Sequence, residues 1–406
     1  MMKQYASHGI LVSDKYSKIR LYAYPAFLAI IYHVADIFRI GVEFAIFAVQ
    51  LLIYIYSVYL LNRVISKNVS ERAGNAIAIG LGVNIFISPY IGIALTESLS
   101  VSLQIAAIAV LARAYFEVNS LSLRKMALMG LTAGIISGLA LMVRPANILF
   151  MAIVIAGCVT TAFHRRETAS RTMAIFLLFS IFGFSLAVAP QFVVNVHLFN
   201  SWTFMPVYHL GSLQIDFGEQ YLKYGTRIAN VARPMPYVNP WYHGDGAASL
   251  KWYVLHPAAG ISTIAMHIFG VLDFDFLFVY IYDTDPWYRW PLFFLSQAAN
   301  FFGILGIARC MRAAINRGHS SERDGARLMI VLLSVFAITW LAICSVSAVE
   351  NRFALPMVAI FLPCAVASIR WLVGSKRVVS VLAMFAVYLA VAAYASTFLS
   401  GLKVVA

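Results

Sequence analysis

A nearly continuous apolar stretch, residues 126–163, limits most strongly how this chain can fold. It is much longer than the roughly 20 residues that one helix needs to cross a bilayer. Arg144 and Pro145 lie in its middle. Proline lacks an amide proton and biases the preceding residue away from helix, so the sequence predicts a corner at Arg144 between two spanning helices.

The composition extends this interpretation to the whole chain. Of the 406 residues, 62% are hydrophobic and only 12% are charged, about half the charged fraction of a soluble globular protein. We expect an all-α polytopic membrane protein with about ten transmembrane helices, plus interfacial helices and one long loop. The expected spans are 41–62, 73–93, 95–112, 126–143, 145–163, 172–195, 289–310, 328–348, 353–373 and 379–399.

The connections between these spans differ in charge. One set carries 17 of the 30 basic residues against five acidic ones, while the remainder carries 13 basic and 12 acidic residues. Cytoplasmic loops hold the excess of Lys and Arg, so the basic set is predicted to be cytoplasmic. The net charge of +13 therefore reflects membrane topology, and we expect no nucleic-acid partner.

The long segment 196–288 falls on the opposite, extracytoplasmic side and is rich in aromatic residues and prolines. It divides the expected single membrane domain into N-terminal spans (1–195), this loop, and C-terminal spans (289–406). Within it, the apolar part 258–282 allows either a non-spanning amphipathic helix or a hairpin, and we favour helices lying on the outer surface. The apolar run 24–38 is too short to span and is interpreted as interfacial or re-entrant.

Polar residues gather at the predicted outer ends of the spans: Thr96-Glu97, Arg144, Glu350-Asn351-Arg352 and His256. Three interpretations stay open for the arginines. They either reach the lipid headgroups or neutralise the glutamates, or Arg144 and Arg352 hold a phosphate, whose oxygens match the forked guanidinium donors. His256 alone is more typical of a helix end. Metal-binding spacing is absent, and the four cysteines lie in apolar runs without such spacing.

Several short motifs together resemble the membrane glycosyltransferases of the GT-C superfamily, most closely the bacterial mannosyl- and arabinosyltransferase-like branch related to protein O-mannosyltransferases. The strings are YAYPAFLAIIYHVADIF, SPYIGIALTESLSVSLQIAAIAVLAR, GLALMVRPANILF, PQFVVNVHLFNSW and ENRFALPM. The resemblance implies a polyprenyl-phosphate-linked sugar donor, a glycan, lipid or protein acceptor, and inverting transfer outside the bacterial inner membrane. No cofactor is certain, and a divalent metal stays open. The implied substrate-binding residues are Tyr24, Glu97, Arg144, His256, Glu350 and Arg352.

The family pattern also implies a first helix and an acidic general base ahead of the landmarks matched by Tyr5 and Gly9. We therefore expect the base upstream of Met1, with Asp14 and Glu97 as weak substitutes within the chain, and little transferase activity from these residues alone. Two other classes stay open. An O-antigen ligase or polymerase would use Arg227 and Arg233 of the long loop, and a lipid-linked sugar transporter or flippase would carry an internal repeat.

The charge asymmetry makes a direct prediction about topology. Reporter fusions after Arg166 and Arg317 should report a cytoplasmic location, and a fusion near Gly244 should report the opposite side. Paired alkaline phosphatase and green fluorescent protein fusions measure this. A cytoplasmic location for residues 210–250 would overturn the assignment of sides.

Overall fold

The structure is a computed structural model of the chain. It describes residues 20–149, 167–208, 210–228, 233–244, 250–315, 325–330 and 349–405, together with short pieces at 7, 18, 152, 155–159, 332–333, 337, 340–341 and 344–347.

The described elements are mostly helices, and the chain divides into two compact units. Unit 1 comprises 1–209 and 309–335, and unit 2 comprises 210–308 and 336–406. The elements are α2 (Ala23–Phe38), α3 (Val42–Asn68), α4 (Glu71–Gly82), α5 (Ser88–Ile91), α6 (Thr96–Glu117), α7 (Leu123–Val143), η1 (Pro145–Leu149), α9 (Glu167–Phe199), α10 (Leu210–Gln220), β1 (Tyr221–Ile228), β2 (Arg233–Val238), α11 (Leu250–Leu255), α12 (Pro257–Leu272), β3 (Tyr280–Ile281), α13 (Arg289–Ile315), η2 (Asn351–Ala354), α15 (Leu355–Val373) and α16 (Val378–Gly401).

Seven helices among the described residues are long and apolar enough to cross a membrane. They confirm the all-α polytopic class and match seven of the ten expected spans; the helices are α3, α6, α7, α9, α13, α15 (with η2) and α16. The structure describes the expected spans 145–163 and 328–348 only in part, so neither span is tested. The remaining expected span needs a correction.

The prediction of a span over 73–93 is wrong. Helix α4 has only 12 residues and ends at Gly82. The Asn84 side chain then accepts hydrogen bonds from the backbone amides of Phe86 and Ile87, at 2.9 and 3.1 Å. A side chain that bonds to nearby backbone in this way competes with the helix, and Pro89 follows within the next short helix.

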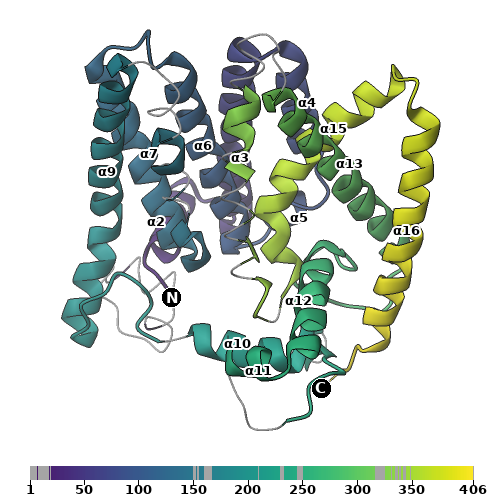
Figure 1. The fold of residues 1–406 in the computed structure, drawn as a ribbon. Helices are drawn as coiled ribbons and strands as arrows, with labels where there is room; N and C mark the ends of the chain where they lie inside the picture. The colour runs from purple at the N-terminus through teal and green to yellow at the C-terminus, as the bar shows by residue number, and fades with distance from the viewer. Residues whose placement is uncertain are drawn as a thin grey trace. The chain divides into compact units, whose positions relative to one another are not determined.

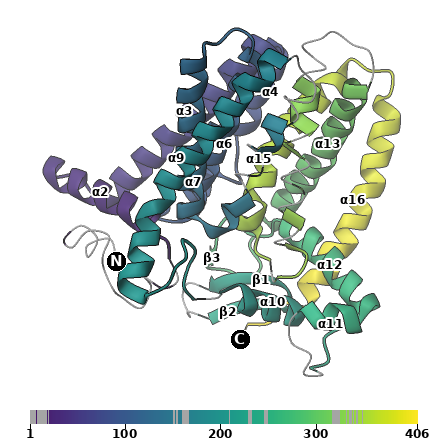
Figure 2. The same ribbon diagram turned by 60° about the vertical axis from the view of Figure 1, so that its left-hand side comes forward.

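Helices α7 and α9 lie side by side in unit 1 in both ribbon views (Figures 1 and 2). Their contact depends on glycines spaced four residues apart in α7: Gly130, Gly134 and Gly138. A Cβ atom at Gly134 would lie 2.0 Å from the Ser180 carbonyl oxygen. Small residues at this spacing let two helix backbones approach closely, as is common between helices in membranes.

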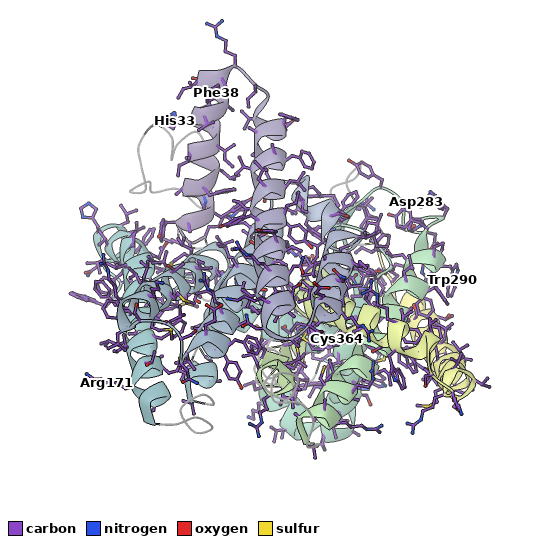
Figure 3. All side chains as sticks on the ribbon, turned by 90° about the horizontal axis from the view of Figure 1, so that it is seen from above. His33, Phe38, Arg171, Asp283, Trp290 and Cys364 are labelled. Carbon is purple, nitrogen blue, oxygen red and sulfur yellow. The ribbon has the colours of Figure 1, made fainter. Side chains whose placement is uncertain are left out.

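The two short apolar segments each form a single short helix, and their placement outside the membrane stays a prediction. Helices α2 and α12 each have 16 residues, fewer than a bilayer crossing needs. Figure 3 shows His33 and Phe38 in the C-terminal half of α2. The hairpin alternative for 258–282 is wrong, because this region forms a single helix followed by the buried Asp273 and Asp275.

Unit 2 also contains a three-stranded sheet that the sequence analysis missed, in the order β2-β1-β3 (Figure 2). Strand β1 pairs antiparallel with β2 and parallel with β3. The side chains of Leu222, Met235 and Ile281 form a buried apolar cluster against it. The cluster also includes Leu399 of α16, so the sheet and the last helix share one apolar core.

The close contact of α7 with α9 predicts a stability effect. Replacing Gly134 with Ala should destabilise the protein by about 1–3 kcal/mol, because the new methyl group meets backbone atoms that cannot move aside. Thermal unfolding in detergent measures this. Gly82→Ala is the matched control, since no atom lies within 4 Å of its Cβ position. Equal unfolding temperatures for both variants would contradict the close contact.

Candidate active site

Asn147 fixes the predicted corner after α7. Its side-chain amide donates to the Ser100 hydroxyl at 2.8 Å and to the Ala140 carbonyl at 2.7 Å, and its oxygen accepts from Gln104 Nε2 at 2.6 Å. Helix α7 ends as predicted, because Arg144 has an extended backbone and Pro145 begins η1. Two of these buried hydrogen bonds hold the corner against α6, and the third ties it to α7.

Glu97 and Arg144 face each other beside this anchor. Glu97 lies in the first turn of α6, where a carboxylate interacts favourably with the helix dipole. Its Oε1 atom lies 3.6 Å from Arg144 Nη1, with side-chain exposures of 2% and 16%. This distance exceeds the 2.7–2.9 Å typical of a charge-assisted hydrogen bond. The structure therefore brings two of the predicted site residues together in a loose ion pair.

Tyr24 belongs to the same part of unit 1. It packs in an apolar cluster with Leu99 of α6 and Val143 of α7. Burial, with the negative charge of Glu97, raises the pKa of its hydroxyl. The hydroxyl oxygen is buried and has no hydrogen-bond partner among the described residues. Tyr24 thus offers a protonated hydroxyl close to the charged pair.

Glu350 and Arg352 form a second ion pair, which lies within unit 2. Arg352 Nε lies 2.6 Å from Glu350 Oε2, and Arg352 Nη2 donates to Glu350 Oε1 at 3.0 Å. Both nitrogens of one edge of the guanidinium are therefore engaged by one carboxylate. This pair is much tighter than the Glu97–Arg144 pair.

The other candidates are placed differently. His256 is the N-cap residue of α12, and its ring lies 5.7 Å from the Trp252 ring. Trp252 and Tyr237 are each 1% exposed, so neither ring offers a face on which a sugar could stack. Asp14 lies outside the described residues. Within the described residues, no group of three or more His, Cys, Asp or Glu side chains could hold a metal ion.

The sequence analysis missed the residues that support the candidates. Asn147 stands in the quoted RPAN string, and a polar side chain two positions after a corner proline could have been recognised as an anchor. Gln104 lies on the same face of α6 as Glu97 and Ser100, at helical spacing. Lys223 of β1 is 1% exposed, but nothing in the sequence distinguishes it from Lys251 of the same loop.

No protein-family model matches the chain, and no curated protein matches it either. Similar solved structures exist. One is the oligosaccharyltransferase AglB from Archaeoglobus fulgidus in complex with an inhibitory peptide and a dolichol-phosphate, with 14% identity and a TM-score of 0.50 over 94% of this chain. The likeness is one of fold. Another is the apo form of the Archaeoglobus fulgidus oligosaccharyltransferase, with 13% identity and a TM-score of 0.49 over 94% of this chain. The chain spans about half the length of these structures, 47% in each case.

Asn147 predicts a local stability effect. Asn147→Ala removes all three hydrogen bonds and leaves the Gln104 amide without its acceptor, so unfolding in detergent should become easier by about 1–3 kcal/mol. Asn68→Ala is the control, because Asn68 makes one bond within its own helix, to Val64. If the two variants unfolded at the same temperature, Asn147 would not anchor the corner.

Proposed function

We propose that the chain is a membrane glycosyltransferase that transfers a sugar from a polyprenyl-phosphate donor to an acceptor on the membrane face opposite the basic loops. The observation that carries the proposal is the shielded Glu97–Arg144 pair at the end of a membrane-spanning helix. The fold supports it, since a solved structure of similar fold is an oligosaccharyltransferase in complex with a dolichol-phosphate. The bacterial inner membrane, as the sequence motifs imply, is the proposed location.

Arg144 is the proposed primary ligand of the donor phosphate. An arginine that only reached lipid headgroups would not need a buried carboxylate beside it. Glu97, with its Oε1 atom 3.6 Å from Arg144 Nη1, balances the charge of the guanidinium. A phosphate could then accept forked hydrogen bonds from Arg144, a geometry that lysine cannot supply.

Arg352, considered within unit 2 by itself, is also a proposed phosphate ligand, and Glu350 modulates it. The tight bond between them at 2.6 Å means that a phosphate must compete with a carboxylate already in place. Glu350 therefore acts as an internal substitute for the anion. Arg352 should contribute less to phosphate affinity than Arg144 does.

The proposed chemistry is displacement at the anomeric carbon. The acceptor hydroxyl gives its proton to a carboxylate general base, for which Glu97 is the substitute among the described residues. Its oxygen forms the new bond while the bond from the anomeric carbon to the phosphate oxygen breaks, and polyprenyl phosphate leaves with the electron pair. Arg144 stabilises the charge that develops on this leaving oxygen. Glu97, 1% exposed and paired with Arg144, orients the sugar or the acceptor, and the Tyr24 hydroxyl donates to a substrate oxygen.

Arginine variants test this function. Arg144→Ala should weaken the binding of farnesyl phosphate, a soluble polyprenyl-phosphate analogue, by on the order of 10- to 100-fold through loss of charge-assisted hydrogen bonds. Arg144→Lys should recover only part of the affinity. Arg352→Ala should weaken binding less. Titration of the purified protein in detergent measures all three.

Two controls make the result decisive. Farnesol lacks the phosphate and should bind equally to all variants. Arg113→Ala removes an arginine near the other end of α6 that is paired with Glu117 at 3.1 Å, and it should bind like the wild type. If Arg144→Leu bound farnesyl phosphate like the wild type, the headgroup-reaching interpretation would replace the phosphate site.

A further inference from the structure

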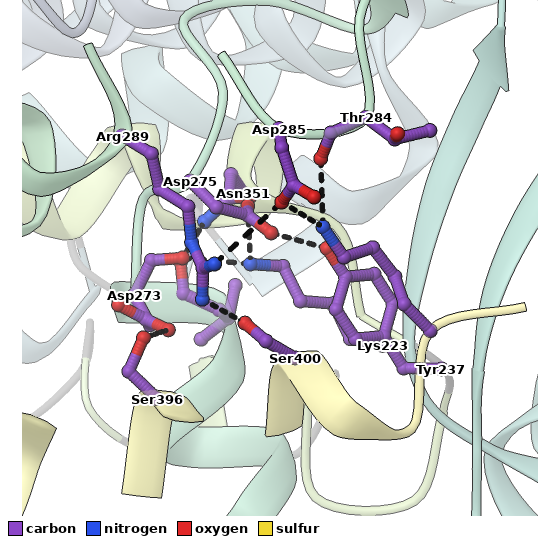
Figure 4. A network of polar contacts seen from close by, with 12 residues as sticks. Lys223, Tyr237, Asp273, Asp275, Thr284, Asp285, Arg289, Asn351, Ser396 and Ser400 are labelled. Atoms are coloured by element: carbon purple, nitrogen blue, oxygen red, sulfur yellow. Dashed lines mark hydrogen bonds and ion pairs between the residues drawn. The ribbon is translucent and has the colours of Figure 1, made fainter. Parts of the chain in front are cut away.

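A buried charged network in unit 2 lies against the segment that carries Arg352 (Figure 4). Lys223 of β1 is 1% exposed. Its Nζ atom donates to Asp275 Oδ1 and to the Asp273 carbonyl oxygen, both at 2.7 Å. The Tyr237 hydroxyl donates to the other oxygen of Asp275. Burying a lysine costs several kcal/mol unless it is paired and hydrogen-bonded, and here it is both.

The Asp273 carbonyl oxygen joins this network to η2. It accepts a second hydrogen bond, from Asn351 Nδ2 at 2.7 Å. The Asp273 carbonyl oxygen therefore accepts hydrogen bonds from Lys223 of β1 and from Asn351, the residue directly before Arg352. Figure 4 shows Lys223 and Asn351 converging there.

The segment is also anchored on its other side. The Tyr224 amide of β1 donates to the Val349 carbonyl at 2.8 Å, and Val349 is fully buried. Val349 and Asn351 thus alternate with Glu350 and Arg352 along the chain. The first two bind the segment to β1 and Asp273, and the other two form the ion pair.

The carboxyl group of Asp273 is separate from this junction. Its Oδ2 atom accepts from Ser396 of α16 at 2.7 Å. Burial raises the pKa of this carboxyl to about 6, against the opposing effect of Lys223. Asn351 therefore depends on the backbone of Asp273 and not on its ionisation.

We propose that Asn351 and Lys223 are positioning residues for Arg352, which hold its guanidinium where it binds the donor phosphate. The inference rests on the proposed function of Arg352 and adds to it the residues that set its geometry. A buried ion pair is weak evidence for stability, since an apolar replacement of similar size often does as well. Placing the Arg352 segment gives the Lys223–Asp275 pair a role that an apolar replacement could not perform.

A double-mutant cycle tests the inference with farnesyl phosphate as the probe. Asn351→Ala should weaken binding by on the order of tenfold when Arg352 is present. In the Arg352→Ala background, the same change should have no further effect, because nothing remains to be positioned. Lys223→Met, which removes the other donor to the Asp273 carbonyl, should behave in the same way.

Asn300→Ala is the matched control. The Asn300 amide donates to the Leu272 carbonyl at 3.3 Å, one residue before Asp273, but from helix α13. Its loss should leave phosphate affinity unchanged in both backgrounds. The inference is overturned if Asn351→Ala weakens binding equally with and without Arg352, or if Asn300→Ala weakens it as much.

Failure of the proposed function gives a different result. If Arg352→Ala alone binds farnesyl phosphate like the wild type, Arg352 is not a phosphate ligand, whatever the cycle shows. If Arg352→Ala weakens binding but the effect of Asn351→Ala is additive, the phosphate site stands and only the positioning role falls.

Discussion

The cost of placing a charge away from water constrains this chain more than any other interaction. In a fold with 62% hydrophobic residues and seven candidate spans among its described residues, an unpaired buried charge would cost several kcal/mol. Glu97 therefore faces Arg144, and Lys223 faces Asp275. Each pair joins segments far apart in the sequence: the start of α6 with the end of α7, and β1 with the connection after α12.

The position of Arg144 illustrates how the sequence builds the proposed phosphate site of unit 1. Glycines in α7 let this helix pack closely against α9. Pro145 ends α7 just after Arg144, and Asn147 binds the resulting corner to α6. Without the close helix packing or the Asn147 anchor, the guanidinium would have no fixed place beside Glu97. A phosphate ligand needs such a fixed place, because forked hydrogen bonds depend on orientation as well as charge.

The sequence predicted the features that follow from local rules. Long apolar runs predicted seven spans that the structure confirms, and the Arg144-Pro145 dipeptide predicted the end of α7. The break after Gly82 was not predicted, because residues 73–93 are mostly apolar and their hydropathy does not report the hydrogen bond from the Phe86 amide to the Asn84 side chain.

Tertiary contacts explain what else the sequence could not predict. The sheet of unit 2 pairs β1 with β3, more than fifty residues further along the chain, and no local pattern indicates such a partner. The Lys223–Asp275 pair has the same origin, since its members are separated by 52 positions. In the sequence, Asp273 and Asp275 interrupt an apolar run, but nothing there identifies Lys223 as the residue that binds them.

The two arginines differ in a way that bears on how a phosphate site could work. Arg144 has a carboxylate at 3.6 Å, while Arg352 has one at 2.6 Å. A carboxylate in close contact keeps a guanidinium in place before any anion binds. The same carboxylate then competes with that anion for the guanidinium. Fixed positions for Val349 and Asn351 limit how far Arg352 can move when Glu350 is displaced. The arrangement therefore suits an anion that enters and leaves, as a phosphate leaving group must, better than one that is bound permanently.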